Sequence, residues 1–529
     1  MIRQFILETD SGIKIVLAVF CFFLFVYVFL VNAWAGDDAY ITFRVVDNFI
    51  GGRGLVYNVG ERVQAYTSPL WFFLMSFFYY FSREPYFTAL GISLILNVVL
   101  LLIVGQYLID NFKEDSWQRF MLFVLLLINS KAFVDYTSSG LENSLAHLIA
   151  GIFFCFFIFG DFGGVEPKTG TIFTLFFTAS LGYLTRQDDL LLFIPVLLYS
   201  AIRYFKRPSW KKTGVVIAGV SPVFLWTVFS LVYYGFPFPN TAYAKLNSTF
   251  PIRIFLEYGK SYYLNSLKWD PTTLVIILIV LVISFLGKDI KDKLAAGGIG
   301  LYILYVLRVG GDFMSGRFFT GVYLVAVLLL IKNLQRSRMV AWLSLFFILM
   351  LLIKPGSSIK TSYDFSYLGV DQSKYGYIND EKGYHFEAAS LIDCFRDKDH
   401  LLWPAHGWVR DGLKMRLITQ PGVLIIGSSG YYGYFCGPLH YIIDRYGLTN
   451  ALLARIPAQG CIGHFARQVP AGYPESLVLK RNLLVDPDLK QFYEILLPVI
   501  RGPVFNWERF KNIFYLNTGK YNYLIKGYF

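Results

Sequence analysis

The stretch Gly36-Asp37-Asp38-Ala39-Tyr40-Ile41-Thr42-Phe43-Arg44 places two adjacent carboxylates just after the uninterrupted apolar run from Ile15 to Val31. A second apolar run begins near Leu70, so the acidic pair lies between two hydrophobic segments. Charged groups at the edge of hydrocarbon are costly to desolvate and tend to mark functional sites. The alternative is an acidic loop that merely lies in water, the usual place for carboxylates. The polar clusters in the rest of the chain weigh against this alternative.

The amino-acid composition indicates a membrane protein. The chain has 529 residues, of which 55% are hydrophobic and only 16% are charged. Many apolar runs approach or exceed the about 18 to 20 residues that a helix needs to cross a bilayer. We therefore expect a polytopic α-helical membrane protein. Much of the formal charge of +12 lies in short loops between the runs, and no basic helix or RNA-binding motif is present, so no nucleic-acid partner is expected.

The apolar runs predict a series of membrane spans. The first run ends in Ala33-Trp34-Ala35, which mimics a signal-peptidase site. The run is longer than the about 7 to 15 residues of a signal-peptide core, so we expect an uncleaved span with a cytoplasmic N-terminus. Further spans are predicted at roughly 66–82, 86–109, 118–136, 143–160, 171–185, 189–205, 213–234, 271–287, 295–309, 318–332 and 339–354.

Basic loops between the runs set the expected orientation, because short cytoplasmic loops are enriched in Lys and Arg. Three such loops lie at 203–212, 288–293 and 332–338. Placing all three in the cytoplasm puts five other segments on the outer side: 138–143, 185–189, 235–270, 310–312 and everything after Lys354.

Eleven crossings is the expected number. Counting every run as a crossing would put the N-terminus outside, against its own charge. Either the run 66–82 dips into the membrane without crossing it, or one marginal run is not a span.

The composition changes after Lys354. Gly, Pro, Asp and short apolar alternations, such as Val423-Leu424-Ile425-Ile426-Gly427, replace the long runs. We expect a membrane domain at 1–354, and at 355–529 a soluble, extracytoplasmic domain of mixed α/β structure.

The five cysteines have no metal-ligand spacing. Cys21 and Cys155 lie inside apolar runs and are expected in the core or facing lipid. Among the three in the C-terminal third, which include Cys394, a disulfide between Cys436 and Cys461 is the pairing we expect.

Five polar clusters are expected on the outer side of the membrane, at the mouths of spans. They are Asp37-Asp38 with Arg44; Thr137 to Asn143, which includes Glu142; Thr185 to Asp189, which includes Arg186 and Asp188; Tyr233 to Lys245, which includes Asn240; and Val309 to Phe318, which includes Asp312 and Arg317.

Each cluster also has a purely structural interpretation. Glu142 could be a carboxylate at the start of a helix, where the helix macrodipole favours a negative charge. Arg186 and Asp188 could form an ion pair, and Lys245 could be a solvated loop lysine. Asp312 with Arg317 could cap and neutralise a tight glycine-rich turn. None of these alternatives explains why acids and bases collect on one side.

The clusters together have the chemistry of group transfer from a lipid-linked phosphate donor. A carboxylate can take the proton of an acceptor hydroxyl, and Arg or Lys can hold a departing phosphate. A polyprenyl tail would remain in the bilayer, which explains a site at the membrane edge. Adjacent carboxylates can also bind Mg²⁺ or Mn²⁺, but the sequence identifies no full ligand set and no certain cofactor.

At this point the chain resembles the GT-C superfamily of membrane glycosyltransferases, and within it the terminal β-(1→2)-arabinofuranosyltransferases of cell-wall arabinan synthesis. The residues that carry the resemblance follow in chain order: Gly36 to Ile41, Gly54 to Asn58, Glu61 to Ser68, Ser139 to Glu142, Asn240 to Lys245, Gly310 to Met314, Gly430 to Tyr432, His440 to Thr449, Ile462 to Arg467 and Pro470 to Tyr473.

The resemblance implies an inverting transferase that uses a polyprenyl-phosphate sugar. It makes Asp37 the first candidate for the catalytic base and Asp38 the second. Donor or acceptor contacts are expected from Arg44, Glu142, Arg186, Asp188, Asn240, Lys245, Asp312, Arg317 and His464. Arg186-Gln187-Asp188-Asp189 departs from the Arg-Pro-acidic form of the relatives, which leaves the roles of Asp188 and Asp189 open.

The resemblance also implies partners and a location. The expected partners are a lipid-linked sugar donor, a cell-envelope glycan acceptor and membrane lipid, in the inner membrane with the site on the periplasmic side. The transferred sugar is arabinofuranose or another pentose or hexose. The competing functions are a transporter, which would keep its ionisable groups near the bilayer midplane, and an envelope-assembly scaffold with a sugar-binding ectodomain.

Overall fold

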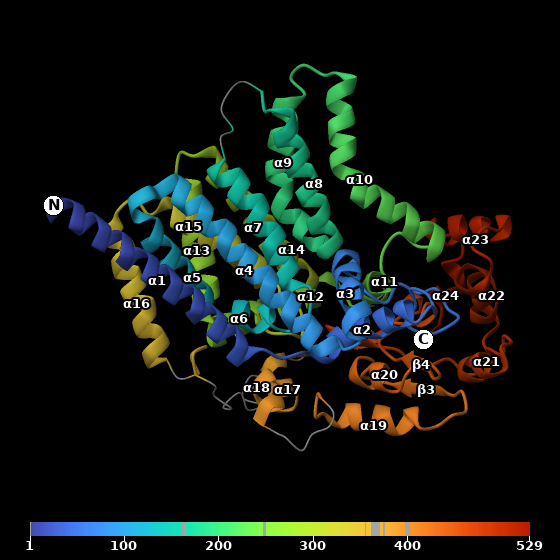
Figure 1. Ribbon diagram of the computed structural model, residues 1–529. Coiled ribbons are helices and arrows are strands. Elements are labelled where there is room, and N and C mark those ends of the chain that lie inside the picture. Colours follow the sequence, from blue (N-terminus) through green and yellow to red (C-terminus); the bar gives the residue numbers. More distant parts are fainter. Residues whose placement is uncertain are drawn as a thin grey trace.

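Long helices follow the apolar runs of the first 354 residues (Figure 1). The computed structural model describes residues 2–160, 162, 166–246, 250–354, 356–360, 371–373, 376–396 and 403–528, with only the backbone described at 2–15, 371–373, 376, 459 and 461. The helices of this part are α1 (Ile2–Asn32), α2 (Asp37–Ile50), α3 (Pro69–Ser82), α4 (Pro85–Phe112), α5 (Ser116–Asn129), α6 (Lys131–Thr137), α7 (Asn143–Phe159), α8 (Thr169–Thr185), α9 (Leu190–Tyr204), α10 (Trp210–Tyr233), α11 (Asn240–Leu246), α12 (Ile252–Trp269), α13 (Pro271–Leu286), α14 (Ile290–Val309), α15 (Phe319–Asn333) and α16 (Ser337–Ile353).

Two of the described helical stretches are long and apolar enough to cross a membrane by length and composition. They are Pro85–Asn129, which includes α4 and α5, and α10. Helices α12 and α13 are long and apolar enough only when taken together, and the chain bends by 109° between them. Val16–Asn32, α7, α15 and α16 are shorter apolar helices. This helical architecture agrees with a polytopic membrane fold, and the number of crossings stays a prediction.

The predicted span 118–136 is wrong in one respect, because it is two helices. Ser130 is extended, and its Oγ accepts a 3.0 Å hydrogen bond from the N–H of Phe133, which caps a new helix. Asp270 Oδ2 accepts a 2.9 Å bond from the N–H of Ala132 at the same break. A capping serine can therefore end one helix and start another inside a run that is apolar overall.

The segment after α16 combines short helices with two-stranded sheets. Its helices are α17 (Glu381–Ala389), α18 (Leu391–Arg396), α19 (Gly407–Arg416), α20 (Tyr431–Phe435), α21 (Tyr473–Leu479), α22 (Pro487–Arg501), α23 (Trp507–Asn517) and α24 (Tyr523–Lys526). The strands are β1 (Asp371–Ser373), β2 (Gly376–Ile378), β3 (Val423–Ile426), β4 (Tyr441–Asp444), β5 (Gln459–Cys461) and β6 (His464–Ala466). The pairs β1–β2 and β5–β6 are antiparallel, and β3–β4 is parallel.

The C-terminal segment shares its hydrophobic core with the helices before it. Tyr431, Phe435 and Ile442 belong to the same buried cluster as side chains of α2, α4 and α15. A second cluster joins α22 to Val63 and Phe236 from the first part of the chain. The boundary at residue 354 therefore stays a prediction, because apolar packing crosses it.

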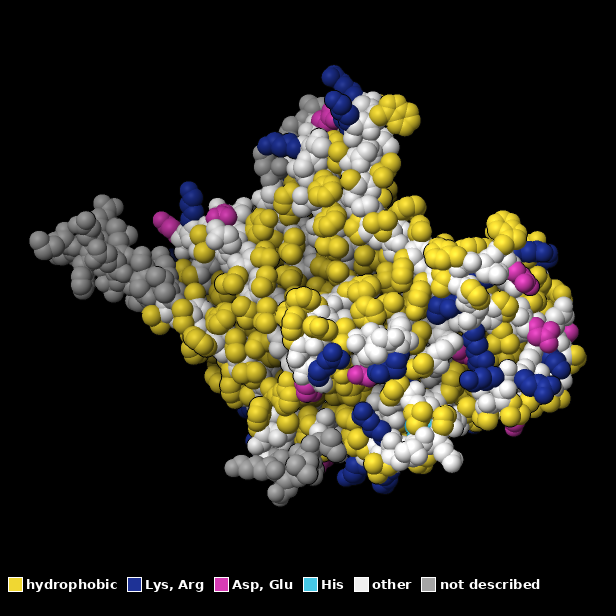
Figure 2. Space-filling view, turned by 45° about the vertical axis from the view of Figure 1, so that its right-hand side comes forward, with side chains coloured by type: hydrophobic (Ala, Val, Ile, Leu, Met, Phe, Trp, Pro, Cys, Tyr) yellow, Lys and Arg dark blue, Asp and Glu magenta, His cyan; other side chains and the backbone are white. Residues whose placement is uncertain are grey.

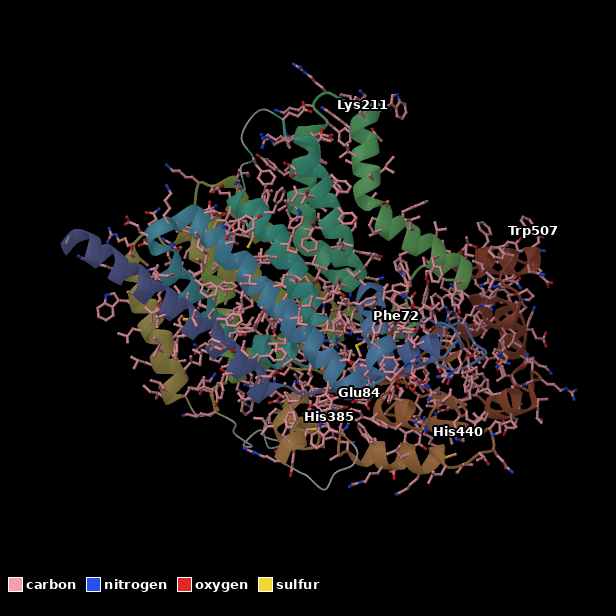
Figure 3. All side chains as sticks on the ribbon, viewed as in Figure 1. Phe72, Glu84, Lys211, His385, His440 and Trp507 are labelled. Carbon is pink, nitrogen blue, oxygen red and sulfur yellow. The ribbon has the colours of Figure 1, made fainter. Side chains whose placement is uncertain are left out.

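Charged side chains lie on either side of the apolar, helical part of the molecule (Figure 2). Figure 2 shows hydrophobic side chains over the helical part of one face, with charged side chains above it and over the C-terminal segment. Lys211, in a predicted cytoplasmic loop, lies at the opposite end of the molecule from His385 and His440 (Figure 3). This arrangement separates the predicted cytoplasmic loops from the C-terminal segment.

Candidate active site

One cavity of about 1050 Å³ collects residues from all five predicted polar clusters and from the C-terminal segment. Every predicted site residue except Arg44 and Asn240 lines it: Asp37, Asp38, Glu142, Arg186, Asp188, Lys245, Asp312, Arg317 and His464. Segments far apart in the sequence therefore meet in one cavity.

Asp37 is the first residue of α2 and is fixed by the start of α20. Its Oδ1 accepts a 2.6 Å hydrogen bond from the N–H of Tyr431, and its Oδ2 accepts a 3.3 Å bond from the N–H of Gly430. A Cβ at Gly430 would lie 1.8 Å from the carbonyl oxygen of Asp37, so only glycine permits this approach. Burial raises the pKa of Asp37, and the two N–H donors offset part of that rise.

Asp38 is half-buried at the cavity wall, and its side chain has no hydrogen bond or ion pair with any described residue. Desolvation raises its pKa to about 7, while the nearby Arg317 guanidinium opposes the rise. The two neighbouring carboxylates thus differ: the oxygens of Asp37 are held by backbone donors, and those of Asp38 are open to the cavity.

Two arginines converge on Glu142 in the wall of the cavity. Glu142 Oε1 lies 3.3 Å from Arg186 Nη1 and 3.3 Å from Arg317 Nη2, and all three side chains are largely buried. A guanidinium has five N–H donors, and the described contacts of each arginine use only some of them. The Glu142 carboxylate therefore holds two guanidinium groups side by side, and each keeps N–H groups that could bind a ligand.

Asp188 holds the other edge of Arg186. Its Oδ2 lies 3.0 Å from Arg186 Nη2 and accepts a 2.6 Å hydrogen bond from the Tyr302 hydroxyl. Burial would raise the pKa of Asp188, but the guanidinium and the hydroxyl outweigh it and hold that pKa below its usual range. The ion-pair interpretation of Arg186 and Asp188 is thus confirmed, and both residues also face the cavity.

Asp312 likewise has a structural contact and a place in the wall. It follows Gly310 and Gly311, which have φ of +84° and +73°, and its Oδ1 accepts a 2.8 Å bond from the N–H of Phe313. Its Oδ2 lies 3.8 Å from Arg317 Nη1. The turn therefore orients Arg317 toward the cavity.

Lys245 and His464 line the cavity from two different elements. Lys245, near the end of α11, is exposed and has no ion-pair partner among the described residues. The centroid of the His464 ring lies 4.1 Å from that of Phe313 and 5.3 Å from that of Tyr377. Burial lowers the pKa of His464, which favours the neutral imidazole.

Arg44 and Asn240 do not line the cavity, so the structure does not bring them together with the other predicted ligand contacts. The Arg44 guanidinium is buried and donates to the carbonyl oxygens of Tyr57 (2.8 Å), Gly433 and His440 (2.9 Å). The Asn240 amide donates to the carbonyl of Gly447 at 2.8 Å, among others. Both side chains join the first part of the chain to the C-terminal segment.

The expected disulfide between Cys436 and Cys461 is wrong, because Cys436 is a free thiol. Its Sγ is buried beside Arg44, 3.3 Å from Nη1, and lies against the backbone of α20. The side chain of Cys461 lies outside the described residues.

The C-terminal wall of the cavity carries residues that the sequence did not indicate. Glu381 Oε1 lies 3.2 Å from His385 Nε2, and its Oε2 accepts a 3.3 Å bond from Asn379. Trp408 and Tyr384 line the same wall. No short motif marks these positions, since they reach the cavity through long-range contacts.

The start of α17 is anchored so that Glu381 faces the cavity. Asp380, just before it, lies 3.0 Å from Lys131 Nζ, and Lys382, just after it, lies 3.2 Å from Asp135. Lys382 also donates a 2.5 Å bond to Asn32 Oδ1. Among the described residues no three His, Cys, Asp or Glu side chains are grouped to hold a metal ion.

No protein-family model matches the chain. It is 27% identical over 320 residues to a terminal β-(1→2)-arabinofuranosyltransferase of Corynebacterium glutamicum (54% of this chain, 46% of that protein) and 25% identical over 316 residues to the one of Mycobacterium tuberculosis (54% and 50%). The chain thus spans about half the length of these curated relatives.

Two solved structures of one protein are also similar in shape. ArnT from Cupriavidus metallidurans bound to undecaprenyl phosphate aligns with a TM-score of 0.49 at 10% identity, over 84% of this chain and 87% of that chain. Its apo state gives 0.48 at 11% identity, over 85% and 88%. The resemblance to terminal β-(1→2)-arabinofuranosyltransferases that the sequence indicated is confirmed, as a similarity over about half of the chain.

Proposed function

We propose that the protein is a GT-C-type glycosyltransferase that moves a sugar from a polyprenyl-phosphate donor to a hydroxyl of a cell-envelope glycan. The observation that carries the proposal is the single cavity in which the Asp37–Asp38 pair meets the two arginines on Glu142. The similarity to arabinofuranosyltransferases supports the same reaction class. The sugar is arabinofuranose or another pentose or hexose.

The reaction is a single displacement. An aspartate takes the proton of the acceptor hydroxyl, and the acceptor oxygen attacks the anomeric carbon. The bond from that carbon to the phosphate oxygen breaks, and polyprenyl phosphate leaves with the electron pair. Attack opposite the leaving group inverts the anomeric centre.

The cations of the cavity have the complementary role. Arg186 and Arg317 would donate to the departing phosphate, and Lys245, at the rim, would add a mobile positive charge. Glu142 keeps both guanidiniums in place before the donor arrives, which lowers the cost of organising them during the reaction. When the donor binds, its phosphate would take the place of water beside the two guanidinium groups.

Asp37 is our first candidate for the base and Asp38 the second. The N–H groups of Gly430 and Tyr431 fix the orientation of the Asp37 carboxylate, and burial raises its pKa, which increases its affinity for a proton. Asp38 has open oxygens and a pKa of about 7, close to the pH at which a base works best. Substituting each one separately distinguishes their roles.

The C-terminal wall would bind the acceptor. Glu381 offers hydrogen-bond acceptors to sugar hydroxyls, and the rings of Tyr384 and Trp408 offer apolar faces on which a sugar ring can stack.

We propose that residues 1–354 form the catalytic membrane domain and that 355–529 lies on the periplasmic side of the inner membrane.

The test is sugar transfer in membranes that contain the full chain. Several radiolabelled polyprenyl-phosphate sugars are offered, and incorporation into envelope glycan is measured for the wild type, Asp37→Asn and Asp38→Asn. Asp47→Asn is the control, because Asp47 lies on α2 but outside the cavity. Transfer that the control retains and the cavity variants lose is expected; equal transfer by all four proteins would overturn the proposal.

A further inference from the structure

The helix α23 carries an exposed stripe of two aromatic residues and one lysine. Trp507 is 83% exposed and Phe514 is 63% exposed, and Lys511 lies exposed between them. The spacing of four and three residues places these side chains on one face of the helix. Arg509 and Ile513 are buried on the opposite face.

The buried face of α23 is fastened to the end of α10. The Arg509 guanidinium, 1% exposed, donates to the carbonyl oxygens of Val232 (2.7 Å) and Tyr233 (2.9 Å), the last residues of α10. The Asn517 amide donates to the carbonyl of Gly235 at 2.8 Å. The position of α23 therefore follows the position of this end of α10.

That end of α10 lies at the outer edge of a predicted membrane span. α10 is one of the described stretches that are apolar and long enough to cross, and Phe224 and Leu225 are exposed along its second half. Figure 1 shows α23 beside the end of α10 and level with the lower half of α8, whereas α19 and α20 lie lower. Trp507 lies at the edge of the molecule, where it projects from α23 (Figure 3). The helix α23 and its exposed aromatic side chains thus lie beside the end of an apolar helix.

We propose that α23 lies in the headgroup region of the outer leaflet, with Trp507 and Phe514 inserted toward the acyl chains. Tryptophan is enriched at this depth because its ring is apolar and its N–H is polar. Lys511 can extend its apolar stem beside the aromatic rings and keep its ammonium among the phosphate groups. The contact would hold the C-terminal segment at the level of the bilayer, independently of the reaction proposed above.

Photo-cross-linking from the full chain in lipid nanodiscs tests the proposal. p-Benzoylphenylalanine replaces Trp507 or Phe514, and in the control it replaces Leu417, which is 82% exposed beyond the end of α19. The nanodiscs contain phosphatidylethanolamine and phosphatidylglycerol, and mass spectrometry measures lipid adducts after irradiation. Each position is exposed, so the substitutions leave the core intact.

Several-fold more lipid adduct at 507 and 514 than at 417 is expected. Adducts no more frequent than at 417, or cross-links to a second copy or another protein in place of lipid, would overturn the proposal. Lys511→Glu supplies a second readout: it should lower the adduct yield at 507 in nanodiscs with phosphatidylglycerol and leave it unchanged in pure phosphatidylcholine. Lys414→Glu, on α19, is the matched control, and equal yields for both variants would contradict a contact with lipid headgroups.

Discussion

The carboxylate of Asp37 accepts a 2.6 Å hydrogen bond from the backbone N–H of Tyr431, although the two residues are 394 positions apart. This bond joins the first helix after the first apolar run to the C-terminal segment. The proposed base therefore takes its orientation from a part of the chain that the membrane helices do not include.

Asp37→Asn should lower sugar transfer by about 10²-fold or more, the usual contribution of a positioned general base. Donor binding should persist, because the arginines on Glu142 are untouched. The measurement is transfer rate together with affinity for undecaprenyl phosphate. If Asp37→Asn transfers normally and Asp38→Asn does not, Asp38 is the base and Asp37 only positions α20.

Arg317→Ala should weaken donor binding by about 10- to 100-fold, as expected when a hydrogen-bonded charge partner of phosphate is lost. It also leaves Glu142 with one arginine, so part of the loss reflects a less ordered wall. Arg308→Ala is the matched control, since Arg308 is exposed on α14 and does not line the cavity. Equal affinities of the two variants for undecaprenyl phosphate would remove Arg317 from the donor site.

The titration of Asp38 predicts a pH dependence of stability. Its pKa in the folded protein is about 7, above the usual value for aspartate, so the folded state favours its protonated form. The stabilisation is complete below about pH 4 and is lost as the pH rises through about 7. Thermal unfolding of Asp38→Asn should therefore change less between pH 5 and pH 8 than that of the wild type; identical profiles would show that Asp38 ionises normally.

Arg44→Gln should destabilise the protein by about 3 kcal/mol or more, because the carbonyls of Tyr57, Gly433 and His440 lose a buried donor. Arg53→Gln, which breaks a partly exposed pair with Asp47, should cost less than about 1 kcal/mol. Thermal unfolding in detergent compares the two. The folded fraction of Arg44→Gln should still bind undecaprenyl phosphate, and a specific loss of donor affinity would return Arg44 to the site.

The sequence predicted the apolar helices and the polar clusters that line the cavity. Both rest on local patterns, namely the length of apolar runs and the charge of the loops between them. The sequence did not distinguish the roles of the two arginines. Arg186 lines the cavity, whereas the guanidinium of Arg44 donates to the carbonyl oxygens of Gly433, in α20, and His440. Both occur beside acidic residues at the mouth of a span, and only packing decides which one meets a ligand.

The C-terminal wall could not be predicted from local patterns. Glu381 reaches the cavity because Lys131 and Asp135 hold the residues on either side of it, and this contact joins segments about 250 positions apart. The break between α5 and α6 is hidden in the sequence for a different reason. One capping serine outweighs the apolar character of the run around it.

A single-turnover experiment with purified chain in nanodiscs tests the central claim most directly. A radiolabelled polyprenyl-phosphate sugar is mixed with envelope glycan, and both the labelled glycan and the released polyprenyl phosphate are measured. We predict that the two products appear in equal amounts with the wild type and that neither appears with the Asp37→Asn, Asp38→Asn double variant. Label that stays on the donor with the wild type, or transfer that survives in the double variant, would contradict the account.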